Sequence, residues 1–237
     1  MAPSGEFVTN IISIITIFVA MVMAFIIGIK VYFQKYRQEK STPLFLLSLF
    51  ALFVGIALIF LGLEKYYLSV AKDQFLGIIF GGMALVSSVI ALITVDSFAF
   101  SIEFLEKFKI LTVITSFFGA IISGFWILDP TRTVENEEII FGDWWSLGFP
   151  ITSLVIFLIS GILAFIPSII ILVYAKRNWK EDPLFSKQLL LLGIGAWAFL
   201  IAYVMEIVGL EPLLASIMRF FFVVAAIFWY WALFKLK

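Results

Sequence analysis

Residues 43–63 read PLFLLSLFALFVGIALIFLGL, and this stretch decides the fold because it contains no charged side chain. Crossing the hydrocarbon core of a bilayer as a helix takes roughly 20 apolar residues. Only helices and closed barrels span lipid, since every backbone polar group must be paired there. The stretch therefore predicts a transmembrane helix.

Six other apolar stretches approach or reach the same length on either side of it. They are Thr9–Ile29, Phe75–Val95, Ile110–Leu128, Leu147–Tyr174, Gln188–Val208 and Pro212–Phe234. The sequence therefore predicts an all-α polytopic membrane protein, a single seven-transmembrane-helix bundle over residues 1–237. Pro167 lies inside the fifth stretch, where a missing N–H is expected to kink the helix.

The composition agrees with this class and removes several chemistries. Of the 237 residues, 63% are hydrophobic and 14% charged, whereas soluble domains carry about 25% charged residues. Histidine and cysteine are absent, which excludes disulfides, His or Cys metal ligands and His-dependent triads. We therefore expect no enzyme, no cofactor and no metal site. A formal net charge of zero gives no reason to expect nucleic acid, and no signal peptide is evident.

The basic residues predict the orientation, because Lys and Arg are retained on the cytoplasmic side. With the N-terminus outside and the C-terminus cytoplasmic, twelve of the sixteen basic residues fall inside. They are Lys30, Lys35, Arg37, Lys40, Lys107, Lys109, Lys176, Arg177, Lys180, Lys187, Lys235 and Lys237. This bias predicts a multi-pass protein of the cell membrane.

The longest outer connection is the acidic loop Asp129–Trp145. Its segments Thr131–Val134 and Ile139–Phe141 predict a short β-hairpin. The loop is either an acidic, cation-binding lid or an ordinary solvated loop.

Ionisable groups within the spans are costly, so they mark candidate sites. Glu206 and Arg219 lie in consecutive helices joined by a short connection, and Arg219 can extend toward Glu206. With Tyr203, Glu64 and Asp73 at its rim, this pair predicts a ligand-binding pocket on the outer side. The alternative is a structural ion pair between two helices.

Three further features invite interpretation. Asp96 is either a proton- or cation-relay group or a marker of the membrane interface. Phe98–Phe108 alternates aromatic and charged residues and is expected to lie along the inner surface. Tryptophans and a tyrosine near the span ends predict an interfacial belt, while Trp197 is a candidate pocket residue. The belt residues are Trp144, Trp145, Trp179, Trp229, Tyr230 and Trp231.

An internal repeat is suggested by two similar runs. The first run begins with Val31-Tyr32 and a basic stretch, continues with Pro43-Leu44-Phe45 and ends with Gly62-Leu63-Glu64. The second run begins with Val173-Tyr174 and a basic stretch, continues with Pro183-Leu184-Phe185 and ends with Gly209-Leu210-Glu211. This predicts a 3+1+3 arrangement of residues 9–95 and 147–234, with 110–128 as the linker helix. Chance similarity is the alternative.

Seven helices in this orientation resemble the microbial rhodopsins. In that family retinal is bound to a lysine in the middle of the last helix. Here Lys235 and Lys237 lie beyond the last span, so we expect no retinal. The runs Gly62-Leu63-Glu64 and Ala202–Glu206 resemble the seven-transmembrane sensor regions that precede prokaryotic histidine kinases. We expect no kinase domain after Lys237. The topology also resembles the 3+1+3 sugar transporters of the SWEET and PQ-loop type, although the sequence contains no Pro-Gln pair.

These features favour a non-enzymatic, receptor-like sensor module that acts through a partner protein. Expected partners are the lipid bilayer, a protein at the basic cytoplasmic loops and a small ligand from the outer side. The alternatives are a small-solute transporter and an assembly subunit of a larger membrane complex.

Overall fold

A computed structural model describes residues 5–128, 133–135, 138–140, 151–208 and 212–236 of the chain. Seven long helices account for most of these residues and confirm the all-α class. They are α1 (Gly5–Lys30), α3 (Thr42–Lys65), α4 (Gln74–Glu103), α5 (Phe108–Leu128), α6 (Ile151–Arg177), α7 (Pro183–Val208) and α8 (Pro212–Phe234).

Six of the seven helices are long and apolar enough over their described residues to cross a bilayer. The remaining helix, α5, is apolar over residues 108–124, a length slightly short of a full span. Helices in lipid satisfy their backbone hydrogen bonds internally. The chain is therefore a multi-pass membrane protein with six to seven membrane-crossing helices.

Two of the helices end in wider, π-helical turns. η1 (Val31–Tyr36) and the short α2 (Arg37–Glu39) continue α1, and η2 (Tyr66–Ala71) continues α3. Each extension stops at a lysine in the left-handed region, Lys40 with φ 50° or Lys72 with φ 56°. The helix that follows each extension has a residue that favours a helix start. In α3 a proline follows Thr42 in the first turn, and in α4 the Asp73 side chain caps the first turn.

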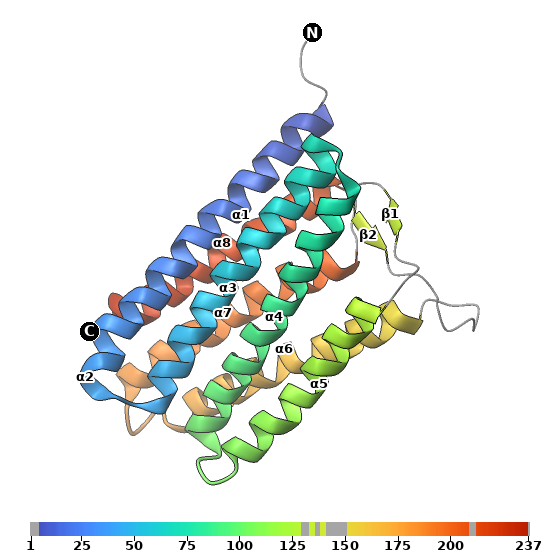
Figure 1. The fold of residues 1–237 in the computed structure, drawn as a ribbon. Helices are drawn as coiled ribbons and strands as arrows, with labels where there is room; N and C mark the ends of the chain where they lie inside the picture. Colours follow the sequence, from blue (N-terminus) through green and yellow to red (C-terminus); the bar gives the residue numbers. More distant parts are fainter. Residues whose placement is uncertain (1–4, 129–132, 136–137, 141–150, 209–211, 237) are drawn as a thin grey trace.

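The helices contact one another in a closed order (Figure 1). α1 packs on α3, α3 on α4, α4 on α6, α6 on α7, α7 on α8, and α8 returns to α1. α5 lies outside this ring, against α4 and α6. α1 begins at one end of the bundle, and α8 finishes at the other.

Aromatic side chains fill the middle of the ring. Phe50 of α3 packs edge-on against Trp229 of α8 with ring centroids 4.9 Å apart, and Phe199 of α7 lies 5.7 Å from the same indole. The Trp229 side chain is 4% exposed, and its N–H donates to the Leu192 carbonyl at 3.2 Å. The expectation that Trp229 belongs to an interfacial belt is therefore wrong, whereas Trp231 is 54% exposed.

The third membrane helix is longer than its apolar stretch suggested. α4 runs to Glu103, and Phe98, Ala99 and Phe100 are buried in the bundle. The chain turns only after Phe104 and enters α5 at Phe108. The expectation that Phe98–Phe108 lies along the membrane surface is therefore wrong, because its first six residues form the buried end of a helix.

The predicted hairpin is present in the described part of the loop. β1 (Thr133–Glu135) and β2 (Glu138–Ile140) pair antiparallel, with Thr133 opposite Ile140. The remaining residues of the loop, including Trp144 and Trp145, lie outside the described residues.

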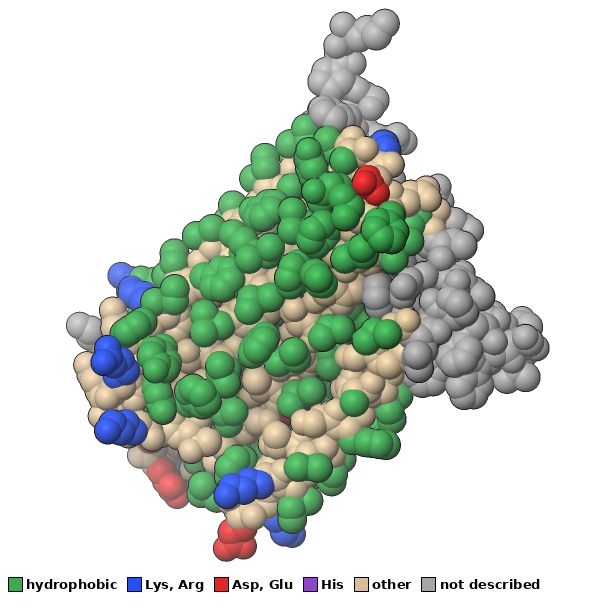
Figure 2. Space-filling view, viewed as in Figure 1, with side chains coloured by type: hydrophobic (Ala, Val, Ile, Leu, Met, Phe, Trp, Pro, Cys, Tyr) green, Lys and Arg blue, Asp and Glu red, His purple; other side chains and the backbone are tan. Residues whose placement is uncertain are grey.

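Charge separates the two ends of the bundle. Lysine and arginine side chains gather at the lower end in Figure 2, where α1, α4, α6 and α8 finish and α3, α5 and α7 begin. We call this the basic end, and the other the opposite end. Between them, Figure 2 shows a surface dominated by hydrophobic side chains, which suits contact with lipid tails.

Candidate functional site

Two pairs of buried polar or charged residues lie toward the opposite end of the bundle, one between α1 and α8 and one on α3. Arg219 of α8 is 4% exposed, and its guanidinium donates a hydrogen bond to the hydroxyl of Ser13 on α1, which is 1% exposed. Glu64 and Lys65 of α3 are also buried, and their side chains form an ion pair with N···O 3.1 Å. We call these four residues the Arg219 cluster.

The packing of α1 against α3 places the members of the cluster at similar depth. A methyl group added at Gly62 would lie 3.1 Å from the Phe18 ring and 3.5 Å from Ile17. Ser13 lies one helical turn from Ile17 toward the opposite end, and Glu64 lies a half-turn beyond Gly62 in the same direction. Arg219 is seven residues into α8, which corresponds to about 10 Å from the helix start. The charges are therefore well inside the bundle, where placing them is expensive.

The other residues predicted for this pocket are distributed more widely. Tyr203 of α7 is 6% exposed and stacks on Phe199 at 6.3 Å, so it forms the end of the aromatic core. Asp73 accepts a hydrogen bond from the Leu76 N–H at 3.1 Å, which explains its presence as a helix cap. The Glu206 side chain lies outside the described residues, and so the predicted Glu206–Arg219 contact does too.

A second buried hydroxyl group, from the neighbouring helix α6, lies near the Tyr203 hydroxyl. Ser160 of α6 is fully buried and near enough to interact with it. Neither hydroxyl makes a hydrogen bond of ordinary geometry with the described residues. The two hydroxyl groups are therefore each other's polar neighbours between α6 and α7.

Trp197 lies apart from the Arg219 cluster. Its ring packs edge-on against Phe165 of α6 at 4.9 Å, and Phe165 is 39% exposed. Trp197 therefore joins α7 to the outward side of α6. This contact accounts for its position without a ligand.

An open apolar groove of about 500 Å³ lies between α3, α4 and α5. It is lined by Phe60, Ile78, Ile79, Gly82, Met83, Val86, Ser87 and Ile127. With only one polar side chain in its lining, it suits an acyl chain better than a charged ligand.

Asp96 occupies the other half of the bundle. It lies in α4, seven residues before Glu103, and is 0% exposed. Residues 97–101, which follow it in α4, are buried as well, so Asp96 lies inside the helix packing; its predicted role as a relay group or as a marker of the membrane interface stays a prediction. Asp96 and the Arg219 cluster are separate polar sites.

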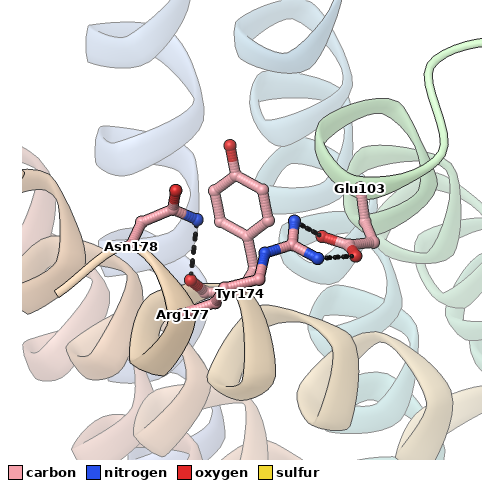
Figure 3. Close-up of polar contacts among 4 residues, drawn as sticks. All are labelled: Glu103, Tyr174, Arg177 and Asn178. Carbon is pink, nitrogen blue, oxygen red and sulfur yellow. Dashed lines mark hydrogen bonds and ion pairs between the residues drawn. The ribbon is translucent and has the colours of Figure 1, made fainter. Parts of the chain in front are cut away.

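Sequence reasoning missed an ion pair that joins α4 to α6 at the basic end (Figure 3). The two terminal nitrogens of the Arg177 guanidinium, Nη1 and Nη2, donate to the two Glu103 carboxylate oxygens at 2.7 Å. The guanidinium also lies over the Tyr174 ring at 5.3 Å. Asn178 donates to the Tyr174 carbonyl at 2.9 Å and closes the end of the helix. The sequence did contain a signal for this pair: Glu103 follows the third predicted span and Arg177 follows the fifth, on the same predicted side of the membrane.

Breaking this ion pair is expected to cost little, because the Arg177 side chain is 58% exposed and water screens the pair. A double-mutant cycle with Glu103→Gln and Arg177→Gln should give a coupling energy of about 0.2–1 kcal/mol. Unfolding of the protein by SDS titration in mixed micelles measures it. A coupling energy of several kcal/mol would contradict this prediction and would mean that the pair is shielded from water.

Comparisons with protein-family models, with curated proteins and with solved structures find no match for this chain. The class of the protein therefore rests on its own helices. It is an all-α, multi-pass membrane protein with seven long helices in its described part, among which the Arg219 cluster and Asp96 are buried.

Proposed function

We propose that the protein is a non-enzymatic sensor or receptor-like module of the cell membrane that binds a small charged ligand at the Arg219 cluster. The observation that carries the proposal is the burial of Arg219 and its hydrogen bond to Ser13 between α1 and α8. Buried ionisable groups in membrane helices are costly and usually mark functional sites. A ligand held there would contact three helices at once, so it could alter how they pack.

The proposed orientation places all seven helices across the membrane, with the Arg219 cluster on the outer side and the basic end in the cytoplasm. The support is the concentration of lysine and arginine at one end of the bundle, which follows the positive-inside rule. Exposed basic side chains at that end, such as Lys180 and Lys187, would contact the partner protein that carries the signal. Charge complementarity favours a partner with an acidic surface.

Ligand binding can be tested with two hydroxyl variants of α1. Ser13 is buried and accepts a hydrogen bond from Arg219, whereas Thr16 is half-buried and donates to the Ile12 carbonyl of the same helix. A hydrogen bond to a charged group contributes about 1.5–3 kcal/mol. Ser13→Ala should therefore weaken ligand binding roughly tenfold or more, and Thr16→Ala should leave it unchanged.

The measurement begins with native mass spectrometry of protein extracted gently from its host membrane, which reports both bound small molecules and associated chains. Any small molecule found is then titrated against the wild type and the two variants in lipid nanodiscs. Equal affinities in the three proteins would remove the Arg219 cluster as the binding site. A protein that binds no small molecule and no other chain would contradict the sensor proposal.

A small-solute transporter is the second candidate, favoured by two polar sites in opposite halves of the bundle. The ring order also divides into α1, α3 and α4 and then α6, α7 and α8, with α5 outside, which suits a 3+1+3 transporter with parallel repeats. Solute flux into liposomes that is abolished by Glu206→Gln at unchanged stability would favour this candidate. A stoichiometric partner without any ligand would instead favour an assembly subunit.

A further inference from the structure

Asp96 is the buried carboxyl group that the proposed ligand site does not use. It lies on α4 about 10 Å from the helix end at Glu103, by the rise of an α-helix. The residue is 0% exposed. Neither of its carboxylate oxygens has a hydrogen-bond partner among the residues that the structure describes.

The helices that pack on α4 bring no positive charge to the depth of Asp96. Besides η2, which lies at the opposite end, these helices are α3, α5 and α6. α3 has no charged residue between Thr42 and Leu63, α5 has none from Ile110 to Leu128, and α6 has none from Ile151 to Ala175. An ionised Asp96 would therefore have no counter-charge on α3, α5 or α6 at its own depth.

The nearest charged groups all belong to the basic end. Arg177 is the charged residue of α6 that reaches α4, and it donates hydrogen bonds to both carboxylate oxygens of Glu103 rather than to Asp96. Lys107 and Lys109 lie at the start of α5, Lys176 is exposed at the end of α6, and Glu106 lies in the turn after α4. Tyr174 is the titratable residue of α6 closest to this level, and its ring lies under the Arg177 guanidinium.

The hydroxyl groups beside Asp96 donate their protons elsewhere. Ser97 donates to the Ile93 carbonyl at 2.7 Å, and Thr112 of α5 donates to the Ser97 hydroxyl at 2.9 Å. Thr94 and Ser101 donate to the Ala91 and Phe98 carbonyls, both at 2.8 Å. These groups can accept a hydrogen bond from Asp96, but they have no proton left to donate to a carboxylate.

We propose that Asp96 is a proton-binding site that holds a proton in the resting protein and exchanges it with water at the basic end. Binding forms the O–H bond of the carboxylic acid from a carboxylate oxygen and a hydronium ion, which leaves as water. The neutral acid removes an uncompensated charge from the bundle and gains a donor that neighbouring carbonyl or hydroxyl oxygens can accept. Because Asp96 is two turns from the basic end, that end is the shorter path for the proton.

Infrared spectroscopy of the protein in lipid nanodiscs tests the proposal through the C=O stretch of a protonated carboxyl group. At neutral pH the wild type should show this band, and it should disappear as the pH rises. Asp96→Asn should lack the band and fold normally, since a neutral amide replaces a neutral acid of the same shape. Asp73→Asn, at the opposite end of the same helix, is the matched control and should keep the band.

Isotope labelling provides a readout that does not depend on a variant's folding. Aspartate labelled with carbon-13 at its side-chain carboxyl should shift the wild-type band, which assigns it to aspartate. A neutral-pH spectrum without an aspartic acid band, or a band that survives in Asp96→Asn, would overturn the proposal. A band that appears only when sodium ions are removed would also overturn it, because the resting site would then hold a metal cation.

Discussion

Trp229→Ala is expected to destabilise the protein by about 3 kcal/mol, at the lower end of the range for large aromatic truncations. The indole packs against Phe50 of α3 and Phe199 of α7, with ring centroids 4.9 and 5.7 Å away, so its removal leaves a cavity between three helices. Lipid tails are as apolar as the bundle interior, and so the loss comes from packing rather than from transfer into water. SDS-induced unfolding in mixed micelles measures the difference.

The matched control lies two residues further along the same helix. Trp231 is 54% exposed, whereas Trp229 is 4% exposed. Trp231→Ala should therefore change the free energy of unfolding by less than about 0.5 kcal/mol. Trp229→Phe retains a ring but loses the N–H donated to Leu192, and an intermediate loss of about 1 kcal/mol is expected. Equal effects of the two alanine variants would contradict the position assigned to Trp229.

The contrast between these two tryptophans shows what the sequence could not provide. Seven helices follow from the length and apolarity of seven stretches, because lipid forces an uncharged segment of that length to be helical. Which side of a helix faces the interior does not follow in the same way. Both sides of α8 are apolar, so the sequence does not show whether Trp229 or Trp231 faces the interior. The two residues point to different sides, because 200° of helical rotation separates them.

The boundary of α4 illustrates a second limit. Asp96 interrupts the apolar stretch, and a charge at that point suggests the end of a membrane helix. The helix instead continues to Glu103, with Phe98 and Phe100 buried. A buried acid and an interfacial acid have the same sequence signature when polar residues follow both. Only the packing of α5 and α6 against α4 distinguishes them.

The sequence named two of the four residues of the Arg219 cluster, Arg219 and Glu64, but neither Ser13 nor Lys65 and none of the contacts. Arg219 was identified because charges inside apolar stretches are rare, and Glu64 was placed at the rim of the predicted pocket; both are buried. The contact between Arg219 and Ser13 joins residues 206 positions apart. It depends on α8 returning to α1 to close the ring. A short connection predicts that consecutive helices are neighbours, but nothing comparable links the first helix to the last.

Gly195→Ala is expected to destabilise the protein by about 1–3 kcal/mol, the usual cost of overpacking a filled core. A Cβ atom at this position would lie 2.5 Å from Nε1 and 2.6 Å from Cδ1 of Trp229, and 3.1 Å from the Ala225 carbonyl oxygen. The indole is held by its hydrogen bond to Leu192 and by its aromatic neighbours. It cannot withdraw without disrupting the core, so α7 and α8 would have to separate.

Gly161→Ala in α6 is the control, because an added Cβ there meets no atom of the described residues within 4 Å. Alanine is favoured over glycine inside a helix by about 1 kcal/mol, so this variant should be neutral or slightly stabilised. Opposite signs for the two substitutions are the expected result of the same SDS titration. Stabilisation by Gly195→Ala would contradict the close contact between α7 and α8.

Combining the two core variants tests the cause of the Gly195→Ala effect. If the added methyl acts through the indole, its cost should fall in a Trp229→Ala background, because the cavity left by the indole accepts it. The two destabilisations should then sum to more than that of the double variant, with a coupling energy of about 1 kcal/mol or more. Strict additivity would instead assign the cost to the Ala225 carbonyl, the other close neighbour of the added methyl. The cycle therefore separates side-chain packing from backbone contact at the α7–α8 seam.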